Sequence, residues 1–182
     1  MKIKKLLLVV LLVSGVSYAL AQNKTEPSKW PVPTKVPGLL FYIQRDPNIN
    51  TVCYTVNLND DGGVDLNDPI DIFWIRYAED GKRKKLNTFQ REFGYGLSFK
   101  TITADSVVIK ALAFPNRTMH LVKNENKIYV VKMKISEQPC ELKRVYIRIT
   151  GGSALTPQIE CIEFYGINSA TRELITERID LR

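Results

Sequence analysis

The chain has 182 residues, and its 26 lysines and arginines against 19 aspartates and glutamates give a net charge of +7 at pH 7. This length suffices for one domain with a substantial core. Three cysteines without a C-x-x-C motif exclude the usual zinc and thiol redox sites.

The first 21 residues have the three-part layout of a secretory signal peptide. Lysines precede an apolar run, and small residues stand at Ala19 and Ala21. The apolar run is too short for about 30 Å of hydrocarbon, and no later segment could span a membrane. Cleavage after Ala21 would remove three lysines and lower the net charge to +4. We therefore predict export to the periplasm or the extracellular space, which argues against a nucleic-acid partner.

Residues 22–38 are rich in proline, which favours extended backbone and removes hydrogen-bond donors. We expect this segment to be a linker or an arm laid across the domain, with Trp30 fixing it to the body. A single β-rich domain is predicted for residues 39–182.

Short runs of β-branched and aromatic residues, separated by turn residues, follow along this domain. Several alternate apolar and polar positions, as half-buried antiparallel strands do. The predicted strands are residues 39–45, 51–58, 70–78, 98–104, 106–114, 117–122, 127–135, 144–150, 159–167 and 173–181.

One segment has helical spacing instead. Leu86, Phe89 and Phe93 recur at intervals of three and four residues, and we predict a short helix that ends at Gly94. The predicted fold is therefore mostly β, an antiparallel two-layer β-sandwich with one short helix, and a β-barrel is the alternative.

Between the second and third predicted strands lies "NLNDDGGVDLND", which nearly has the register of a calcium-binding loop. However, its flanks are strand-like, whereas such loops lie between helices, and Asn, Asp and Gly are also ordinary turn residues. The segment is thus either a Ca²⁺ loop or a polar turn. The metal ligands would be Asn57, Asn59, Asp61, Gly63, Asp65 and Asp68.

The basic run and the cysteines each have two interpretations. Lys82 to Lys85 form the densest basic run, either a solvated loop or a contact for an anionic envelope or glycan partner. Among the cysteines, a hairpin centred near Ala154 would separate Cys140 from Cys161. A Cys53–Cys161 disulfide and buried free thiols both remain open.

The sequence contains no clear motif of a catalytic site. His120 is the single histidine, it lies in an ordinary predicted strand, and no serine stands in a G-x-S-x-G turn. We therefore identify no catalytic residue and expect no cofactor apart from Ca²⁺ at the acidic loop. A hydrolase would need a site assembled from residues distant in sequence.

Several phrases, among them "FYIQR", "WIRYAEDG", "RVYIRITGG" and "IECIEFYG", resemble a family of bacterial proteins, often secreted, called domain of unknown function 4833. The resemblance covers residues from about Gly38 to the C-terminus and implies no activity or site residue. We therefore predict that the protein is an extracytoplasmic binding or scaffolding module without enzymatic activity. The alternatives are a calcium-stabilised structural envelope protein and a hydrolase.

Overall fold

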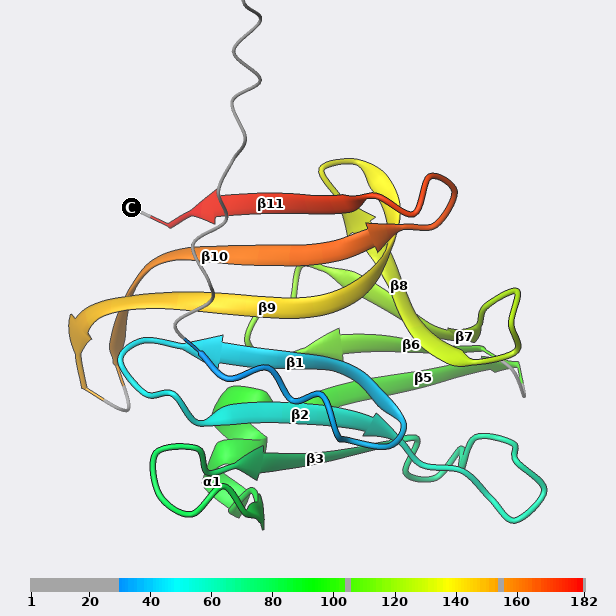
Figure 1. The fold of residues 1–182 in the computed structure, drawn as a ribbon, viewed down its shortest axis with the longest axis horizontal. Coiled ribbons are helices and arrows are strands. Elements are labelled where there is room, and N and C mark those ends of the chain that lie inside the picture. Colours follow the sequence, from blue (N-terminus) through cyan, green and yellow to red (C-terminus); the bar gives the residue numbers. More distant parts are fainter. Residues whose placement is uncertain (1–29, 104–105, 154–155, 182) are drawn as a thin grey trace, which may run out of the picture.

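The computed structural model describes residues 30–103, 106–153 and 156–181, so the predicted signal peptide and the first part of the proline-rich segment lie outside the described residues. In the described part the chain forms strands and one short helical segment (Figure 1). The strands are β1 (Leu39–Arg45), β2 (Thr51–Val56), β3 (Ile70–Ile75), β4 (Arg83–Lys85), β5 (Leu97–Thr103), β6 (Ser106–Ala111), β7 (Thr118–Lys123), β8 (Tyr129–Ile135), β9 (Gln138–Gly152), β10 (Pro157–Asn168) and β11 (Leu174–Asp180).

All of these strands belong to one sheet, whose main path runs β4-β3-β2-β1-β9-β8-β7-β6-β5, with β10 and β11 on the other edge of β9. The long strand β9 pairs with β8 through residues 138–141 and with β1 through residues 144–147. The β1–β9 pairing is parallel, and the other pairings are antiparallel. One strand thus has two successive neighbours on the same edge, and the sheet must bend there.

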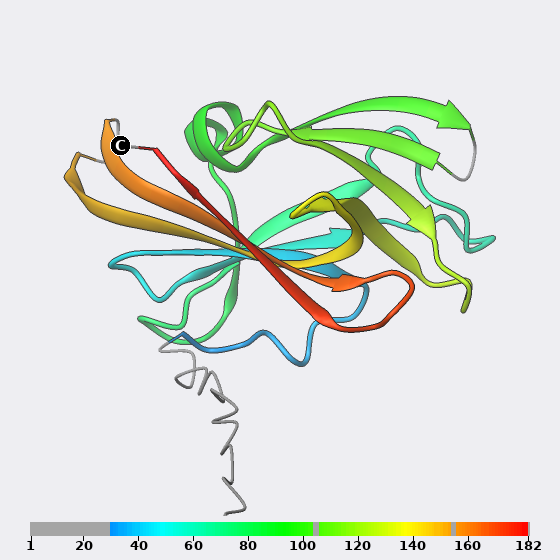
Figure 2. The same ribbon diagram turned by 90° about the horizontal axis from the view of Figure 1, so that it is seen from above.

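The bend brings β5, β6 and β7 behind β1, β2 and β3, as the two perpendicular views show (Figures 1 and 2). The sheet is curled into a half-barrel. The predicted β-rich class with one short helix is confirmed, whereas the two-layer sandwich is not. The barrel alternative is partly consistent with the curled sheet.

The basic run is an edge strand instead of a loop. Arg83, Lys84 and Lys85 form β4 and pair with β3, and all three side chains are exposed. Arg83 lies over the Phe73 ring at 3.7 Å and also pairs with Asp71. Charged side chains are suited to an open edge because they oppose pairing with another chain.

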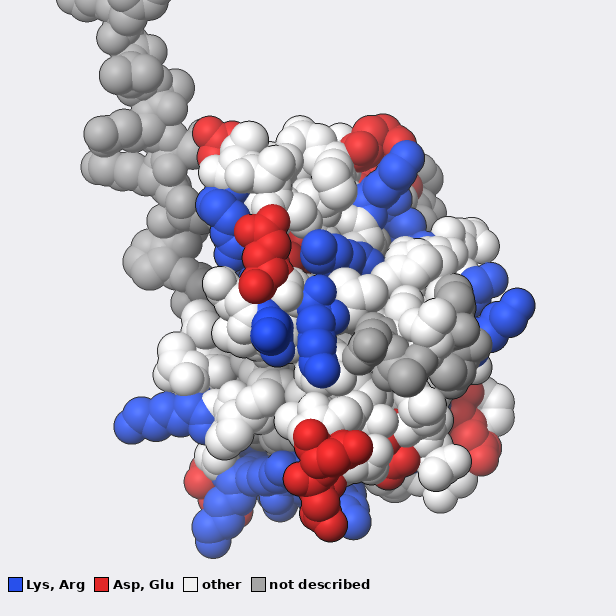
Figure 3. Space-filling model, turned by 90° about the vertical axis from the view of Figure 1, so that its right-hand side faces the viewer, with Lys and Arg blue, Asp and Glu red and all other residues white. Residues whose placement is uncertain are grey.

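Alternation along the strands places charged side chains outside the curl. In β8, for example, Lys132 and Lys134 point away from the core, while Val131, Met133 and Ile135 are buried. On the side of the molecule seen in Figure 3, basic side chains lie among acidic and uncharged ones. That side therefore presents no large area of a single charge.

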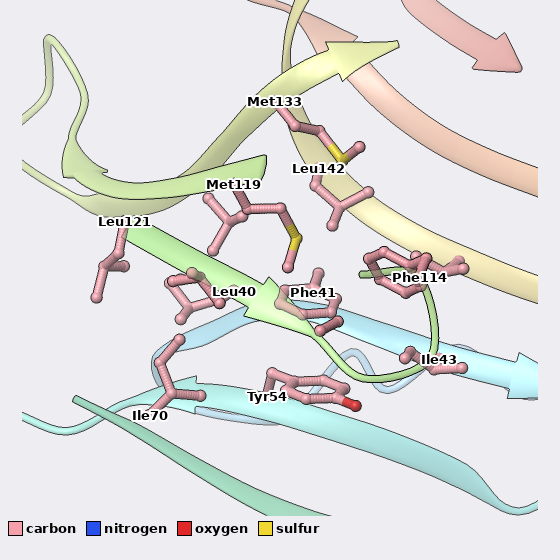
Figure 4. Packing of buried hydrophobic residues seen from close by; sticks show 14 of the residues in the cluster. Leu40, Phe41, Ile43, Tyr54, Ile70, Phe114, Met119, Leu121, Met133 and Leu142 are labelled. Atoms are coloured by element: carbon pink, nitrogen blue, oxygen red, sulfur yellow. The ribbon is translucent and has the colours of Figure 1, made fainter. Parts of the chain in front are cut away.

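The inner face of the curl is filled by one cluster of apolar side chains from both halves of the sheet. Figure 4 shows Phe41 and Tyr54, from the front strands, facing Met119 and Leu121 of β7. The Phe41 and Tyr54 rings stack with their centroids 4.2 Å apart. Because both halves bury apolar area against each other, neither face of this core would be stable alone.

The outer face of β1 to β3 is covered by the arm, residues 30–38, which crosses in front of β1 and β2 in Figure 1. Trp30 is buried, as expected, and Val36 packs on a second small cluster around Cys53 and Phe73. The buried Gln44 amide donates to the Pro31 carbonyl at 2.9 Å. This cover explains why β2 is buried on both faces instead of alternating.

The helical segment is α1 (Thr88–Gln90), continued by a π-helical turn η1 (Arg91–Tyr95). The prediction that Gly94 ends the helix was wrong, because the turn continues to Tyr95. Leu86 is buried, but Phe89 and Phe93 are exposed. Helical spacing shows that residues share a face, and it does not show whether that face meets the core.

Candidate functional site

An aromatic cleft of about 770 Å³ lies between the helical segment, the corner after β1, and the end of the hairpin at which β9 ends and β10 begins. Its side chains come from three segments that are far apart in the sequence. Those that define its chemistry are Arg45, Asp46, Phe89, Phe93, Tyr95 and Ile149.

Two stacked phenylalanine rings form the rim of the aromatic cleft. The Phe89 and Phe93 side chains are 47% and 71% exposed, and their ring centroids lie 5.0 Å apart at an interplanar angle of 30°. Two neighbouring apolar rings left in water are unusual, because burying each would stabilise the fold by about 1.5–3 kcal/mol. Such exposed apolar area often marks a binding surface.

The ring pair is held by a rigid base. Asn87 caps α1 by accepting from the Gln90 backbone at 2.8 Å, and the Gln90 side chain accepts from the Asn87 backbone at 3.1 Å. The indole of the buried Trp74 also donates to Gln90, at 3.2 Å. Tyr95 packs edge-on against Trp74, with centroids 5.1 Å apart. These contacts join the rim to the core.

Gly96 allows the chain to turn directly from η1 into β5. A Cβ at this position would lie 1.9 Å from the Arg91 carbonyl oxygen, which no side chain can accommodate. By contrast, a Cβ at Gly94 would meet nothing within 4 Å. Close backbone approach at Gly96 therefore sets the position of the helical turn over the cleft.

A positive charge lies in the wall of the aromatic cleft. Arg45, at the end of β1, has a buried Nε that finds no hydrogen-bond partner among the described residues. Burial raises the pKa of the neighbouring Tyr95 phenol, and the charge of Arg45 acts against that rise. A guanidinium in an apolar surrounding is a suitable partner for a carboxylate, sulfonate or phosphate.

The corner after β1, at Asp46 and Pro47, is held by a hydrogen bond from β9. Asp46, which precedes a cis peptide bond to Pro47, accepts a hydrogen bond from the Tyr146 hydroxyl. Tyr146 in turn lies beside Trp30 of the arm, with ring centroids 6.4 Å apart. Burial first, and then the bond to Asp46, raise the pKa of Tyr146 to about 12. One oxygen of the Asp46 carboxylate is thus engaged by Tyr146.

The acidic loop forms a hairpin of its own. Leu58 and Val64 form a β-bridge, and Val64 is buried in the core. The side chains of Asn57 and Asn59 donate to the carbonyls of Asp68 and Val64.

The remaining loop positions also bind the loop's own backbone. Asp61 accepts from the Gly63 backbone at 2.8 Å, and Asp65 accepts from that of Asn67 at 2.9 Å. The Gly63 carbonyl accepts from Asn59. Within the described residues, no cluster of three or more His, Cys, Asp or Glu side chains could hold a metal ion. The loop shows the hydrogen bonding of turns, and Ca²⁺ binding stays a prediction.

The three cysteines are free and buried. In the β9–β10 hairpin Cys161 lies opposite Arg148, and Cys140 lies opposite Asn168, so these two cysteines are separated as predicted. Burial raises the pKa of the Cys53 thiol to about 12, against the opposing charge of Arg83. A thiol that keeps its proton is a poor nucleophile and a poor metal ligand.

His120 lies on β7, remote from the aromatic cleft, in a second hollow of about 770 Å³. Its cross-strand neighbours are Val108 and Lys132. Among the described residues that line this hollow, the charged ones are basic, and none is a carboxylate. The described residues that line this hollow therefore do not supply the serine and aspartate of a Ser-His-Asp arrangement.

Sequence reasoning did not find the aromatic cleft. The glycine-flanked "FGYG" was the nearest signal, since Phe93, Gly94 and Tyr95 line the cleft. Arg45 and Asp46 carry no local signal, because their proximity to the helix depends on pairings between distant strands.

The half-barrel and the aromatic cleft together define a mostly β protein with an aromatic-rimmed cleft. In the described residues, no helix has the length and apolar character needed to cross a membrane. The model of the family described as domain of unknown function (DUF4833) matches residues 41–178, and the chain belongs to this family. No curated protein and no solved structure matches the chain.

Proposed function

We propose that this protein is an exported, non-enzymatic binding module and that the aromatic cleft holds its ligand. The observation that carries the proposal is the stacked pair Phe89 and Phe93, which stands in water at the rim of a cleft although the rest of the helical segment is anchored to the core. A rigid surface that displays apolar rings favours binding, because little conformational entropy is lost when a ligand arrives.

The cleft's chemistry indicates the class of ligand. Phe89 and Phe93 offer ring faces for stacking, Ile147 and Ile149 give an apolar wall, and Arg45 supplies one positive charge. A ring-bearing molecule with a single anionic group would match all three features.

The test titrates the protein, residues 22–182, with 8-anilinonaphthalene-1-sulfonate. This fluorescent probe has fused rings and a sulfonate group. Phe89→Ala/Phe93→Ala should raise the Kd at least about tenfold, equivalent to 1.4 kcal/mol. Arg45→Gln should weaken binding of this anionic probe, whereas binding of the neutral N-phenyl-1-naphthylamine should be almost unaffected.

Phe99→Ala is the matched control, because Phe99 is also partly exposed but lies on β5 and does not line the aromatic cleft. Its Kd should equal that of the wild type. If the double variant bound the probe as well as the wild type, or if Phe99→Ala lost as much affinity, the cleft would not be the binding site.

Export rests on the signal-like residues 1–21. Mass spectrometry of the protein recovered from the periplasm or the culture medium should give a mature chain that begins at Gln22. A chain that keeps Met1 and stays in the cytoplasm would disprove export but leave the binding proposal standing.

A further inference from the structure

The outer face of β5 to β8 carries several lysines on neighbouring strands. Register pairs Lys100 with Val108, Val108 with His120, and His120 with Lys132, so these side chains lie on one face and cross four strands. Lys110 and Thr118 form a second pair beside that row. Strands are spaced by about 4.8 Å, so the row from β5 to β8 extends over roughly 15 Å.

Most lysines of this face have no acidic partner among the described residues. Lys100, Lys110 and Lys132 form no ion pair with any described residue. Lys134 has one exposed pair with Glu137, at 3.4 Å. Unpaired like charges on a single face repel one another, and an anionic ligand would relieve that repulsion.

Two acidic groups at the margins of this face are already paired. The row ends at Glu141 of β9, whose buried carboxylate is bound by Lys143 and Arg172 at 3.1 Å each. Glu177 is paired with Arg117. The face therefore keeps its positive character up to the edge of β8.

The face is also hollowed. The second hollow, which contains His120, lies over β7 and β8, and Lys132 and Lys134 line it together with Thr118. We propose that this basic face binds a linear polyanion, a polymer with a phosphate or carboxylate group on each repeat. A small anion could contact only one or two of these lysines, whereas a polymer can follow the row across the strands.

The proposal is independent of the aromatic cleft, because the two sites share no lining residue. Binding to polyphosphate and to polygalacturonate, measured by fluorescence anisotropy, would identify the anionic group that the face prefers. Affinity for the preferred polymer should fall as salt rises, since the Debye length is only about 10 Å at 0.1 M. Monomeric phosphate at equal charge concentration should not compete.

Lys100→Gln/Lys110→Gln/Lys132→Gln should weaken polymer binding at least tenfold. The matched control is Lys82→Gln/Lys84→Gln/Lys85→Gln, which removes the same charge from exposed positions at and beside β4 and should leave the Kd nearly unchanged. Thermal melts of both variants would verify folding. Equal losses in the two variants, competition by monomeric phosphate, or binding to anionic vesicles but to neither polymer would overturn the proposal.

Discussion

Tyr146, in the middle of β9, donates a hydrogen bond to Asp46, the first residue after β1, and so joins the central strand to the corner that lines the aromatic cleft. The same phenol ring lies beside Trp30 of the arm. The arm, the parallel strand pair and the cleft wall therefore meet at one buried side chain. Changes at Tyr146 should affect both stability and binding.

Tyr146→Phe should lower the free energy of unfolding by about 1–3 kcal/mol, because it removes a hydrogen bond to a charged group and keeps the ring. It should also weaken binding of the naphthalene sulfonate probe. Urea denaturation and probe titration measure the two effects. Tyr165→Phe is the matched control, since Tyr165 also donates to a carboxylate, that of Glu163, away from the cleft. It should lower stability without changing probe affinity.

Stability should decline at alkaline pH. Burial, followed by bonds to Asp46 and Glu163, raises the pKa of Tyr146 and Tyr165 to about 12 each, above the ordinary value of 10.0. A raised pKa in the folded state gives stability that is complete below pH 10 and is lost as pH rises toward 12. Tyrosinate absorbance at 295 nm, followed beside urea midpoints from pH 8 to 12, checks this. Ionisation of these tyrosines near pH 10 in the folded protein would contradict the prediction.

Glu141 should contribute to stability at neutral pH. Burial alone would raise the pKa of its carboxyl group, but Lys143 and Arg172 outweigh burial and hold the pKa below its ordinary value. A lowered pKa gives stability that is present above about pH 4.5 and is lost as pH falls further. Glu141→Gln should therefore unfold at a lower urea concentration at pH 7, and the difference from the wild type should shrink by pH 3. An equal difference at both pH values would show that the charge is not responsible.

Gly96→Ala should destabilise the protein by roughly 1–3 kcal/mol, since its Cβ would overlap the Arg91 carbonyl. It should also weaken probe binding, because the helical turn that carries Phe93 must move. Gly94→Ala serves as the control, because there is open space around that position, and it should change the urea midpoint by much less. Equal midpoints for the two variants would refute the role given to Gly96.

Calcium binding to the acidic loop is tested by thermal melts of residues 22–182 in EDTA and in millimolar Ca²⁺. Filling a micromolar site at about a hundredfold excess would add about 2.7 kcal/mol and raise the Tm by roughly 5–10 °C. The hydrogen bonds of Asp61 and Asp65 to the loop backbone lead us to expect coincident melts. A shift that chelator reverses and Asp61→Ala abolishes would instead establish a metal loop.

Local patterns predicted most of the strands well. Residues 39–45 form β1 as expected, and the alternation in β8 predicted its buried and exposed faces. The three charged residues of β4 have no apolar alternation, and only their pairing with β3 makes them a strand. The two-layer sandwich was not confirmed, because β9 pairs with β8 and then with β1 along the same edge and the sheet curls there. No local sequence pattern indicates that two distant strands share one edge of a third.

The cleft was beyond sequence reasoning for a related reason. Phe89 and Phe93 had the right spacing for one helical face, but their exposure depends on where β9 ends and β10 begins. In the sequence, Arg45 is an ordinary residue at the end of a predicted strand. Only the pairing of β1 with β9 shows that it lies beside Ile147 in the wall of the cleft.

The parallel pairing of β1 with β9 joins positions about a hundred residues apart, as with Tyr42 and Arg144. A growing chain therefore completes β1, β2 and β3 long before their central partner exists. Until then the inner edge of β1 offers its backbone groups to any extended peptide nearby. Pairings of such sequence separation slow folding, so a chain of this topology should stay open through most of its synthesis. For a protein with a signal-like N-terminus, that delay would leave time to pass through a translocation channel before the half-barrel closes.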